Sequence, residues 1–239
     1  MKKLLFKLFC IFIPSSGLRH IFRFIGMNNK VIFIKDGKTI NFLFNLKILK
    51  NFKISGYGTN NIIKIHLPAN FTNSSINIAG NNCHFEIFPT TRLLDKTTFQ
   101  LYGNNAQIII GKDFSSTGNT MILATGNHSV TIGDDTIIAM DTIIQTSDFH
   151  TVYDINTKKI TNKDSNIAIG KHVWIARRCI ILKGASIPNN TIVSAQALVN
   201  KKFDEQNTII AGIPAKIVKN QINWDFNTPE AYKEYFNKS

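Results

Sequence analysis

Aliphatic residues recur at every sixth position in the second half of the chain. The uninterrupted run is Ile169, Ile175, Ile181, Ile187, Val193 and Val199, and an earlier stretch contains Ile132, Ile138 and Ile144. A six-residue unit can turn one side chain inward on a short strand and use the remaining residues for a corner. Three such units close a triangular coil, and stacked coils pair their backbones with the coils above and below. The pattern predicts an all-β solenoid, whereas an ordinary β-sandwich does not explain a period of six.

A longer period runs through the first half. Gly80-Asn81-Asn82, Gly103-Asn104-Asn105 and Gly126-Asn127-His128 recur at intervals of 23 residues, and Gly58-Thr59-Asn60-Asn61 precedes them by 22. An aliphatic residue follows each in register, namely Ile65, Ile87, Ile110 and Ile132. Apolar and polar residues alternate between these positions, which is typical of strands. We expect coils with wider or bulged corners in this half.

The period of six breaks after Ile144 and restarts at Ile167. The intervening residues, 147–166, are mostly polar, and excursions of this length from a compact repeat are usually functional. His150 lies where the chain leaves the regular coils. We therefore expect its ring on the wall of the solenoid rather than in the column of inward side chains.

Composition narrows the class of protein. Hydrophobic residues make up 44% and charged residues 18% of the 239 residues, which excludes a disordered or collagen-like chain. No apolar run reaches the roughly 20 residues that span a bilayer. Cys10, Cys83 and Cys179 are far apart, which argues against a disulfide framework and fits a reducing compartment. A net charge of +13 favours anionic partners, but the basic residues are scattered, so we do not expect nucleic acid.

The first 26 residues form a basic amphipathic segment. Five basic residues are interleaved with Leu, Ile and Phe: Lys2, Lys3, Lys7, Arg19 and Arg23. The apolar stretch is divided by Lys7 and ended by Pro14, so it lacks the uninterrupted core of a signal peptide. Two alternatives remain, a helix at a membrane surface and a helix packed on the protein or on a neighbouring subunit. We expect a cytoplasmic protein, with peripheral contact to the inner face of the membrane through residues 1–26 under the first alternative.

Four segments together resemble a known family. They read TSDFHTVYD from Thr146, IGKHVWI from Ile169, IILKG from Ile180 and IAGIPAK from Ile210. The chain resembles the hexapeptide-repeat acyltransferases, and among them the bacterial O-acetyltransferases of sugars and cell-surface polysaccharides, including polysialic acid. The resemblance covers about Gly58 to Lys219. It implies a left-handed parallel β-helix, acetyl-CoA as the acetyl donor, and a homotrimer in which two chains share each site.

The resemblance also implies roles for two residues, His150 and Trp174. A sugar hydroxyl is a poor nucleophile and must lose its proton as it attacks the thioester, and imidazole can accept that proton near neutral pH. His150 is therefore the expected general base. Trp174 is expected to shape the acyl pocket, and its backbone N–H is expected to stabilise the developing oxyanion.

Further positions follow from the resemblance. Acetyl-CoA is expected to lie along the coils between neighbouring subunits, where the cationic residues would meet its phosphates. The expected cofactor contacts are Trp174, Arg177, Ala195, Asn200, Lys201, Ala211, Lys216 and Lys219. Asp148 and Tyr153 are expected to contact the acceptor, while Asp148 or Asp154 could instead orient the imidazole or simply solubilise the loop.

The spacing of three histidines raises the alternative of a metal site. His128, His150 and His172 are each 22 residues apart, the spacing expected of ligands on adjacent coils, but His128 lies four residues before Ile132 and His172 three after Ile169. They would occupy different parts of the coil, so we expect no metal. Two other functions remain open, N-acetylation of an amino sugar or nucleotide sugar and a non-catalytic glycan-binding scaffold.

Three segments are expected in all. Residues 1–54 form a basic, Phe-rich lead-in, 55–213 the β-helix acyltransferase domain with the loop 147–166, and 214–239 a C-terminal tail. Thr228-Pro229-Glu230 predicts a short helix from Pro229 to about Asn237. That helix would cover the open end of the column or clasp a neighbouring subunit. The expected function is O-acetylation of a capsule or lipopolysaccharide sugar, sialic acid-containing polymers among them.

Overall fold

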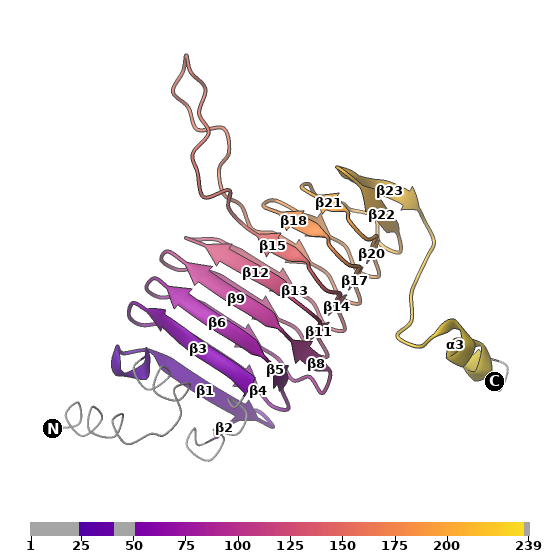
Figure 1. The fold of residues 1–239 in the computed structure, drawn as a ribbon, viewed down its shortest axis with the longest axis horizontal. Coiled ribbons are helices and arrows are strands. Elements are labelled where there is room, and N and C mark those ends of the chain that lie inside the picture. Colours follow the sequence, from indigo (N-terminus) through magenta and orange to yellow (C-terminus); the bar gives the residue numbers. More distant parts are fainter. Residues whose placement is uncertain (1–23, 41–50, 237–239) are drawn as a thin grey trace.

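The computed structural model describes residues 24–40 and 51–236, so most of the amphipathic segment 1–26 lies outside the described residues. The described chain forms three sheets that enclose one core (Figure 1). Successive strands pass from one sheet to the next, and neighbouring strands within each sheet are parallel except at the two ends. The molecule is a parallel β-helix with a triangular cross-section, as predicted.

The three sheets are named A, B and C. Sheet A contains β1 (Lys30–Lys35), β2 (Lys38–Ile40), β4 (Ile62–His66), β7 (His84–Ile87), β10 (Gln107–Ile110), β13 (Ser129–Ile132), β16 (Ile167–Ile169) and β19 (Ser186–Ile187). Sheet B contains β3 (Phe52–Tyr57), β6 (Ser74–Ala79), β9 (Thr97–Tyr102), β12 (Thr120–Thr125), β15 (Ile143–Gln145), β18 (Ile180–Leu182) and β21 (Leu198–Val199). Sheet C contains β5 (Asn70–Thr72), β8 (Leu93–Asp95), β11 (Ser115–Ser116), β14 (Ile137–Ile138), β17 (Trp174–Ile175), β20 (Ile192–Val193), β22 (Ile209–Gly212) and β23 (Ala215–Lys219).

The residues of the six-residue period fill the interior. All of those predicted to point inward, from Ile132 to Val199, are at most 4% exposed. Ile169 is paired with Ile187, one coil further on, and Ile181 is paired with Val199. The column therefore forms because each coil of three units brings the same position back into register.

The longer period of the first half comes partly from longer strands. β12 and β13 have six and four residues, whereas β18 and β19 have three and two. Some corners are longer as well: the corner after the sheet A strand spans residues 88–92 in the first half and 188–191 in the second, and the corner from sheet B to sheet A spans 103–106 and 183–185. The additional residues therefore lie partly in wider corners, as expected, and partly in longer strands of sheets A and B.

The Gly-Asn repeats form a ladder where sheet B leads into sheet A. A Cβ on Gly80 would lie 1.7 Å from the carbonyl oxygen of Gly103, so only glycine allows the coils to stack there. Asn81 Oδ1 accepts the backbone N–H of Thr59 at 2.9 Å, and Asn104 Oδ1 accepts that of Asn81 at 3.0 Å. The asparagine side chains thus satisfy corner amides that no strand pairs.

Antiparallel pairs close both ends of the prism, β1 with β2 and β22 with β23. Phe24, at the end of the amphipathic segment, is 1% exposed and belongs to the core. Parallel pairing begins at Lys30, ahead of the start expected at residue 55. None of the helices in the described part of the chain is both long and apolar enough to cross a membrane.

The predicted C-terminal helix is α3 (Pro229–Phe236). Figure 1 shows α3 beside the prism rather than over its end. The expectation that it covers the open end of the column is wrong, because the β22–β23 pair and Phe203, which is 7% exposed, occupy that end.

Candidate active site

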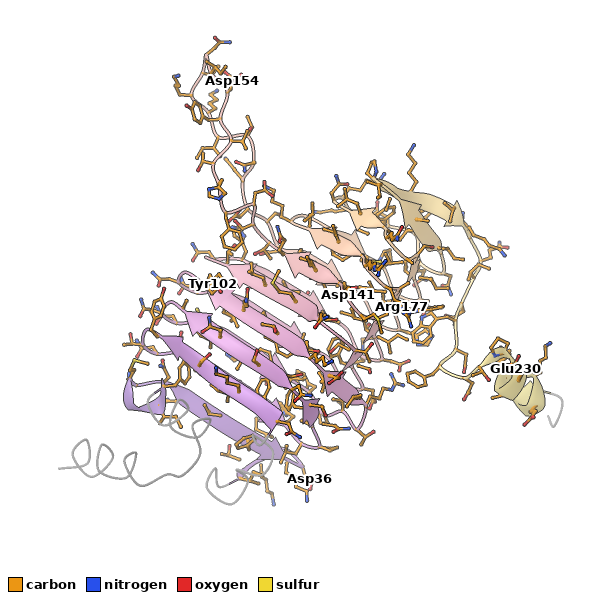
Figure 2. The ribbon with its side chains drawn as sticks, viewed as in Figure 1. Asp36, Tyr102, Asp141, Asp154, Arg177 and Glu230 are labelled. Atoms are coloured by element: carbon orange, nitrogen blue, oxygen red, sulfur yellow. The ribbon has the colours of Figure 1, made fainter. Side chains whose placement is uncertain are left out.

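Residues 147–166 leave the prism between β15 and β16 as a projecting arm (Figure 1). Tyr153 and Ile160 form an antiparallel bridge along it. Asp154 lies near the end of the arm, as Figure 2 shows, and its Oδ1 accepts the backbone N–H of Thr157 at 2.7 Å. That bond, followed by the one from the Thr157 hydroxyl, lowers the pKa of Asp154. Asp154 therefore stabilises the turn of the arm.

The base of the arm is held by a hydrogen-bond network. Lys183 donates from Nζ to Asp148 Oδ2 and, at 2.6 Å, to the carbonyl oxygen of Asn162. Asn162 Nδ2 donates to Asp148 Oδ2 at 3.0 Å and to the carbonyl oxygen of His150 at 2.7 Å. The bond from Lys183, then that from Asn162, lowers the pKa of Asp148. The network fixes the backbone of His150 to the coil that carries Lys183.

The His150 side chain is exposed at the base of the arm, outside the column of inward side chains. Among the described residues, neither Asp148 nor Asp154 hydrogen-bonds its ring. Tyr153 is 54% exposed further out on the arm, with Lys158 Nζ 5.5 Å from its ring centroid. The acceptor contacts of Asp148 and Tyr153 remain predictions.

Trp174 lies on the outer face of sheet C, in β17, and is 38% exposed. Its backbone N–H donates to the carbonyl oxygen of Thr191 at 3.0 Å, in the next coil. The expectation that this N–H stabilises an oxyanion is wrong, because coil pairing already occupies it. The indole itself stays available for a pocket wall.

The predicted cofactor contacts fall into two groups. Arg177 and Ala195 occupy equivalent corners between sheets C and B, and the Gln196 N–H donates to the Arg177 carbonyl oxygen at 2.9 Å (Figure 2 labels Arg177). Ala211 pairs with Lys216 between β22 and β23. The structure thus brings these residues to the same side of the prism as Trp174.

Asn200 and Lys201 form the second group. They follow β21, and the Ser186 N–H donates to the Lys201 carbonyl oxygen at 3.3 Å, which places them where sheet B leads into sheet A. Lys219 pairs with Ile209 at the other end of the β22–β23 pair from Lys216. The three side chains are exposed, but one chain does not gather them at a single point.

No family model matches the chain. A polysialic acid O-acetyltransferase of Neisseria meningitidis is 30% identical over 190 residues, which cover 71% of this chain and 88% of that protein. The chain belongs to the hexapeptide-repeat O-acetyltransferases. A polysialic acid O-acetyltransferase of Escherichia coli O1:K1 is 34% identical over 119 residues, but these cover 50% of this chain and 38% of that protein. The solved polySia-specific acetyltransferase NeuO superposes with a TM-score of 0.59 at 25% identity, covering 79% of this chain and 91% of that one.

Family membership confirms the predicted left-handed β-helix, and the prism now separates the two principal residues of this O-acetyltransferase. His150 lies at the edge where sheet B leads into sheet A, and Trp174 lies on sheet C. In a three-sided prism, sheet C is the face opposite that edge. One chain therefore does not bring His150 and Trp174 together. Of the three histidines spaced by 22, His128 and His150 lie where sheet B leads into sheet A, whereas His172 lies between sheets A and C.

Sequence reasoning missed the residues that hold the arm. Asn162 and Lys183 were not assigned roles, although Lys183 lies in one of the segments that carry the resemblance. Asn162 is one polar residue among many in its loop, and nothing in the sequence distinguishes it. Lys183 directly follows the regular strand β18, and nothing in the repeat indicates that its side chain bonds to the arm.

Proposed function

We propose that the protein transfers an acetyl group from acetyl-CoA to a hydroxyl of a bacterial cell-surface polysaccharide. The observation that carries this proposal is the exposed side chain of His150 in a chain of the O-acetyltransferase family, with its backbone carbonyl held at the base of the arm by Asn162. We expect the reaction to take place in the cytoplasm, because the widely separated cysteines fit a reducing compartment.

His150 acts as the general base. Its neutral imidazole takes the proton of the acceptor hydroxyl while that oxygen attacks the thioester carbonyl. The new C–O bond forms, the C–S bond breaks, and coenzyme A leaves as a thiolate that recovers the proton from the imidazolium. Trp174 forms a wall of the acyl pocket. Arg177, Lys216 and Lys219 supply positive charge for the cofactor phosphates, which exposed lysines and arginines suit.

The site is shared between two chains of a homotrimer. Support comes from the position of His150 at one edge and of Trp174 on the opposite face, because neighbouring copies can bring such surfaces together. Asn200 and Lys201 lie at the same edge as His150 and would meet the cofactor of the adjoining copy. The oxyanion donor must then be a group other than the Trp174 N–H.

The acceptor is an acidic glycan. The net charge of +13 favours it, and Lys183, Lys201 and Lys202 occur at or near the edge that carries His150. Opposite charge raises the local concentration of a polyanion and accelerates its association. Sialic acid-containing polymers are the first acceptors to test.

The test is release of free CoA thiol from acetyl-CoA across neutral and acidic glycans. We expect turnover with an acidic polymer, and a loss of about 10²–10⁴-fold in kcat for His150→Ala. His84→Ala is the matched control, because His84 pairs with Glu86 on sheet A, away from the arm. Turnover of His150→Ala near that of the wild type would refute the base assignment, and no thiol release with any acceptor would refute the function.

A further inference from the structure

The C-terminal tail turns back from β23 before it reaches α3 (Figure 1). Its contacts with Asn207, His172 and Arg92 place it at the edge between sheets A and C. We call residues 220–226 the strap. The Ile222 N–H donates to the carbonyl oxygen of Asn207 at 2.9 Å, in the last coil. Two residues later Trp224 reaches His172, which belongs to an earlier coil. The strap therefore crosses several coils, running from the last coil back toward earlier ones.

Trp224 and His172 are joined by three contacts. Their rings stack with centroids 4.2 Å apart and planes 7° apart. Trp224 Nε1 donates to the His172 carbonyl oxygen at 2.9 Å, and His172 Nε2 lies 3.0 Å from the Trp224 carbonyl oxygen. Two reciprocal hydrogen bonds and a stacked ring fix both the position and the orientation of the indole.

The coils beneath hold His172 in turn. Asp135 Oδ2 lies 2.5 Å from His172 Nδ1, and Asp135 Oδ1 pairs with Arg92 Nη1 at 2.6 Å. The guanidinium of Arg92 lies 4.6 Å from the ring centroid of Phe226, the next aromatic residue of the strap. Arg92, Asp135 and His172 come from three coils at the same edge of the prism, with the coil of β10 and β11 between those of Arg92 and Asp135. The strap therefore docks on a row of polar groups that spans several coils.

Trp224 also faces Trp174. The two indole centroids are 6.2 Å apart and their planes are inclined by 50°. The backbone of Trp174 is fixed by coil pairing, but its side chain projects outward and is 38% exposed. Ile137 and Ile192 flank Trp174 in the adjacent strands of sheet C. Among the described residues, Trp224 is the aromatic ring that contacts the outward-facing indole, so it limits the orientations that this indole can adopt.

We infer that Trp224 is a positioning residue: through the strap it holds the Trp174 indole in the orientation that the acyl pocket needs. This inference rests on the proposed function for the role of Trp174 in catalysis, but the physical contact can be tested without it. Misplacement of a pocket wall lowers the rate of the chemical step more than it weakens cofactor binding. Loss of Trp224 should therefore lower kcat and leave the KM for acetyl-CoA nearly unchanged.

The chain contains two tryptophans, so replacing Trp224 leaves Trp174 as the sole indole fluorophore. In Trp224→Phe the stacked ring is kept, and we expect the anisotropy of Trp174 to decay mainly with overall tumbling. In Trp224→Ala we expect an added fast component, because side-chain motion of an unrestrained exposed residue occurs on the picosecond-to-nanosecond scale. Acrylamide should also quench Trp174 more strongly in Trp224→Ala.

The kinetic arm uses the same proteins. We expect kcat to fall roughly ten-fold in Trp224→Ala, and to stay within about two-fold of the wild type in Trp224→Phe. Glu230→Gln, on the exposed helix α3, is the control and should match the wild type. His172→Gln is the second variant, should Trp224→Ala not fold, and should lower kcat in the same direction because it weakens the docking of the strap.

The inference is overturned if Trp174 is as immobile in Trp224→Ala as in Trp224→Phe. It is also overturned if Trp174 becomes mobile while kcat stays unchanged. If the wild-type protein transfers acetyl to no acceptor, the proposed function fails, and the anisotropy measurement still decides whether Trp224 restrains Trp174.

Discussion

The coils before the arm are wide and the coils after it are narrow, although both enclose a core of apolar side chains. Before the arm, sheet B strands such as β9 and β12 have six residues, and after it β18 has three and β21 two (Figure 1). Backbone pairing and handedness are common to both regions. The width of a coil is therefore set mainly by strand length, and some of the wide coils also have longer corners.

Each region fills its interior with side chains of matching volume. The wide coils bury phenylalanines, among them Phe52, Phe85 and Phe99, and Phe52 stacks on Phe71 at 4.0 Å. The narrow coils bury Ile, Val, Ala and Cys at equivalent positions. A wider triangle encloses more volume per coil, and close packing requires bulkier residues to occupy it. This accounts for the buried phenylalanines of the wide coils, although other Phe residues, such as Phe149 and Phe226, are exposed.

The predicted functional residues are also distributed unequally between the two regions. Every predicted cofactor contact lies in or beyond the narrow coils, and the arm with His150 leaves at the junction of the two regions. The wide coils contribute Arg92 to the docking of the strap and a stable platform below the junction. Changes that disturb one region more than the other can test how far this division holds.

The largest expected effect is the loss of a ring from a wide coil. Phe99 is fully buried and contacts the Phe85 ring edge-on at 4.9 Å. We expect Phe99→Ala to lower the free energy of unfolding by about 3–5 kcal/mol, because the cavity cannot close between stacked coils. Urea unfolding followed by far-ultraviolet circular dichroism, at one fixed protein concentration, measures this.

Tyr57→Ala is the matched control for Phe99→Ala. It removes an aromatic ring of the same region that is 65% exposed, and should change stability by no more than about 0.5 kcal/mol. Equal losses in the two variants would mean that phenylalanine volume does not support the wide coils.

The converse substitution tests the narrow coils. Ile181 is fully buried in β18, where the coil has no room for a ring. We expect Ile181→Phe to destabilise by about 1–3 kcal/mol through overpacking. Ile180→Phe places the same ring on the outer face of the same strand, at a residue that is 41% exposed, and should have little effect on unfolding in urea. If Ile181→Phe is as stable as the wild type, coil width does not follow strand length.

The sequence predicted the narrow coils better than the wide ones for a physical reason. With two or three residues per strand, every sixth side chain has to point inward, so Ile169 to Val199 reveal the coil directly. In the wide coils, β-branched residues can lie in a strand or a corner, and the Gly-Asn repeat gives the period but not where the additional residues go. The sequence indicated where the arm leaves the coils, because the period of six is interrupted between Ile144 and Ile167.

The strap was not predictable from the sequence. Trp224 and His172 are 52 residues apart and meet because the tail reverses direction after β23. No period relates them, and a Trp in a polar tail has no pattern to mark its partner. The same holds for Asn162, whose contact with His150 depends on the path of the arm.

The smallest expected effect is a difference in labelling between two buried thiols, one in each region. Cys83 lies in a wide coil and Cys179 in a narrow one, at 1% and 0% exposure. Burial raises the pKa of both thiols, so in the folded protein they stay protonated and unreactive, since the thiolate is the nucleophile. In a Cys10→Ser background, a thiol reagent at pH 8 should label neither until the coils open.

The order of labelling then compares the two regions. In urea below the unfolding midpoint, Cys179 should react before Cys83, with local opening free energies that differ by on the order of 1 kcal/mol, because narrow coils bury less apolar surface. Raising the pH should promote labelling further. The contribution of a pKa that is raised by folding is fully present below the pKa of the unfolded thiol, about 8.5, and is lost as the pH rises from there through the raised pKa of the folded thiol. Mass spectrometry of labelled peptides gives the order, and earlier labelling of Cys83 would show that the phenylalanine-filled coils are the weaker region.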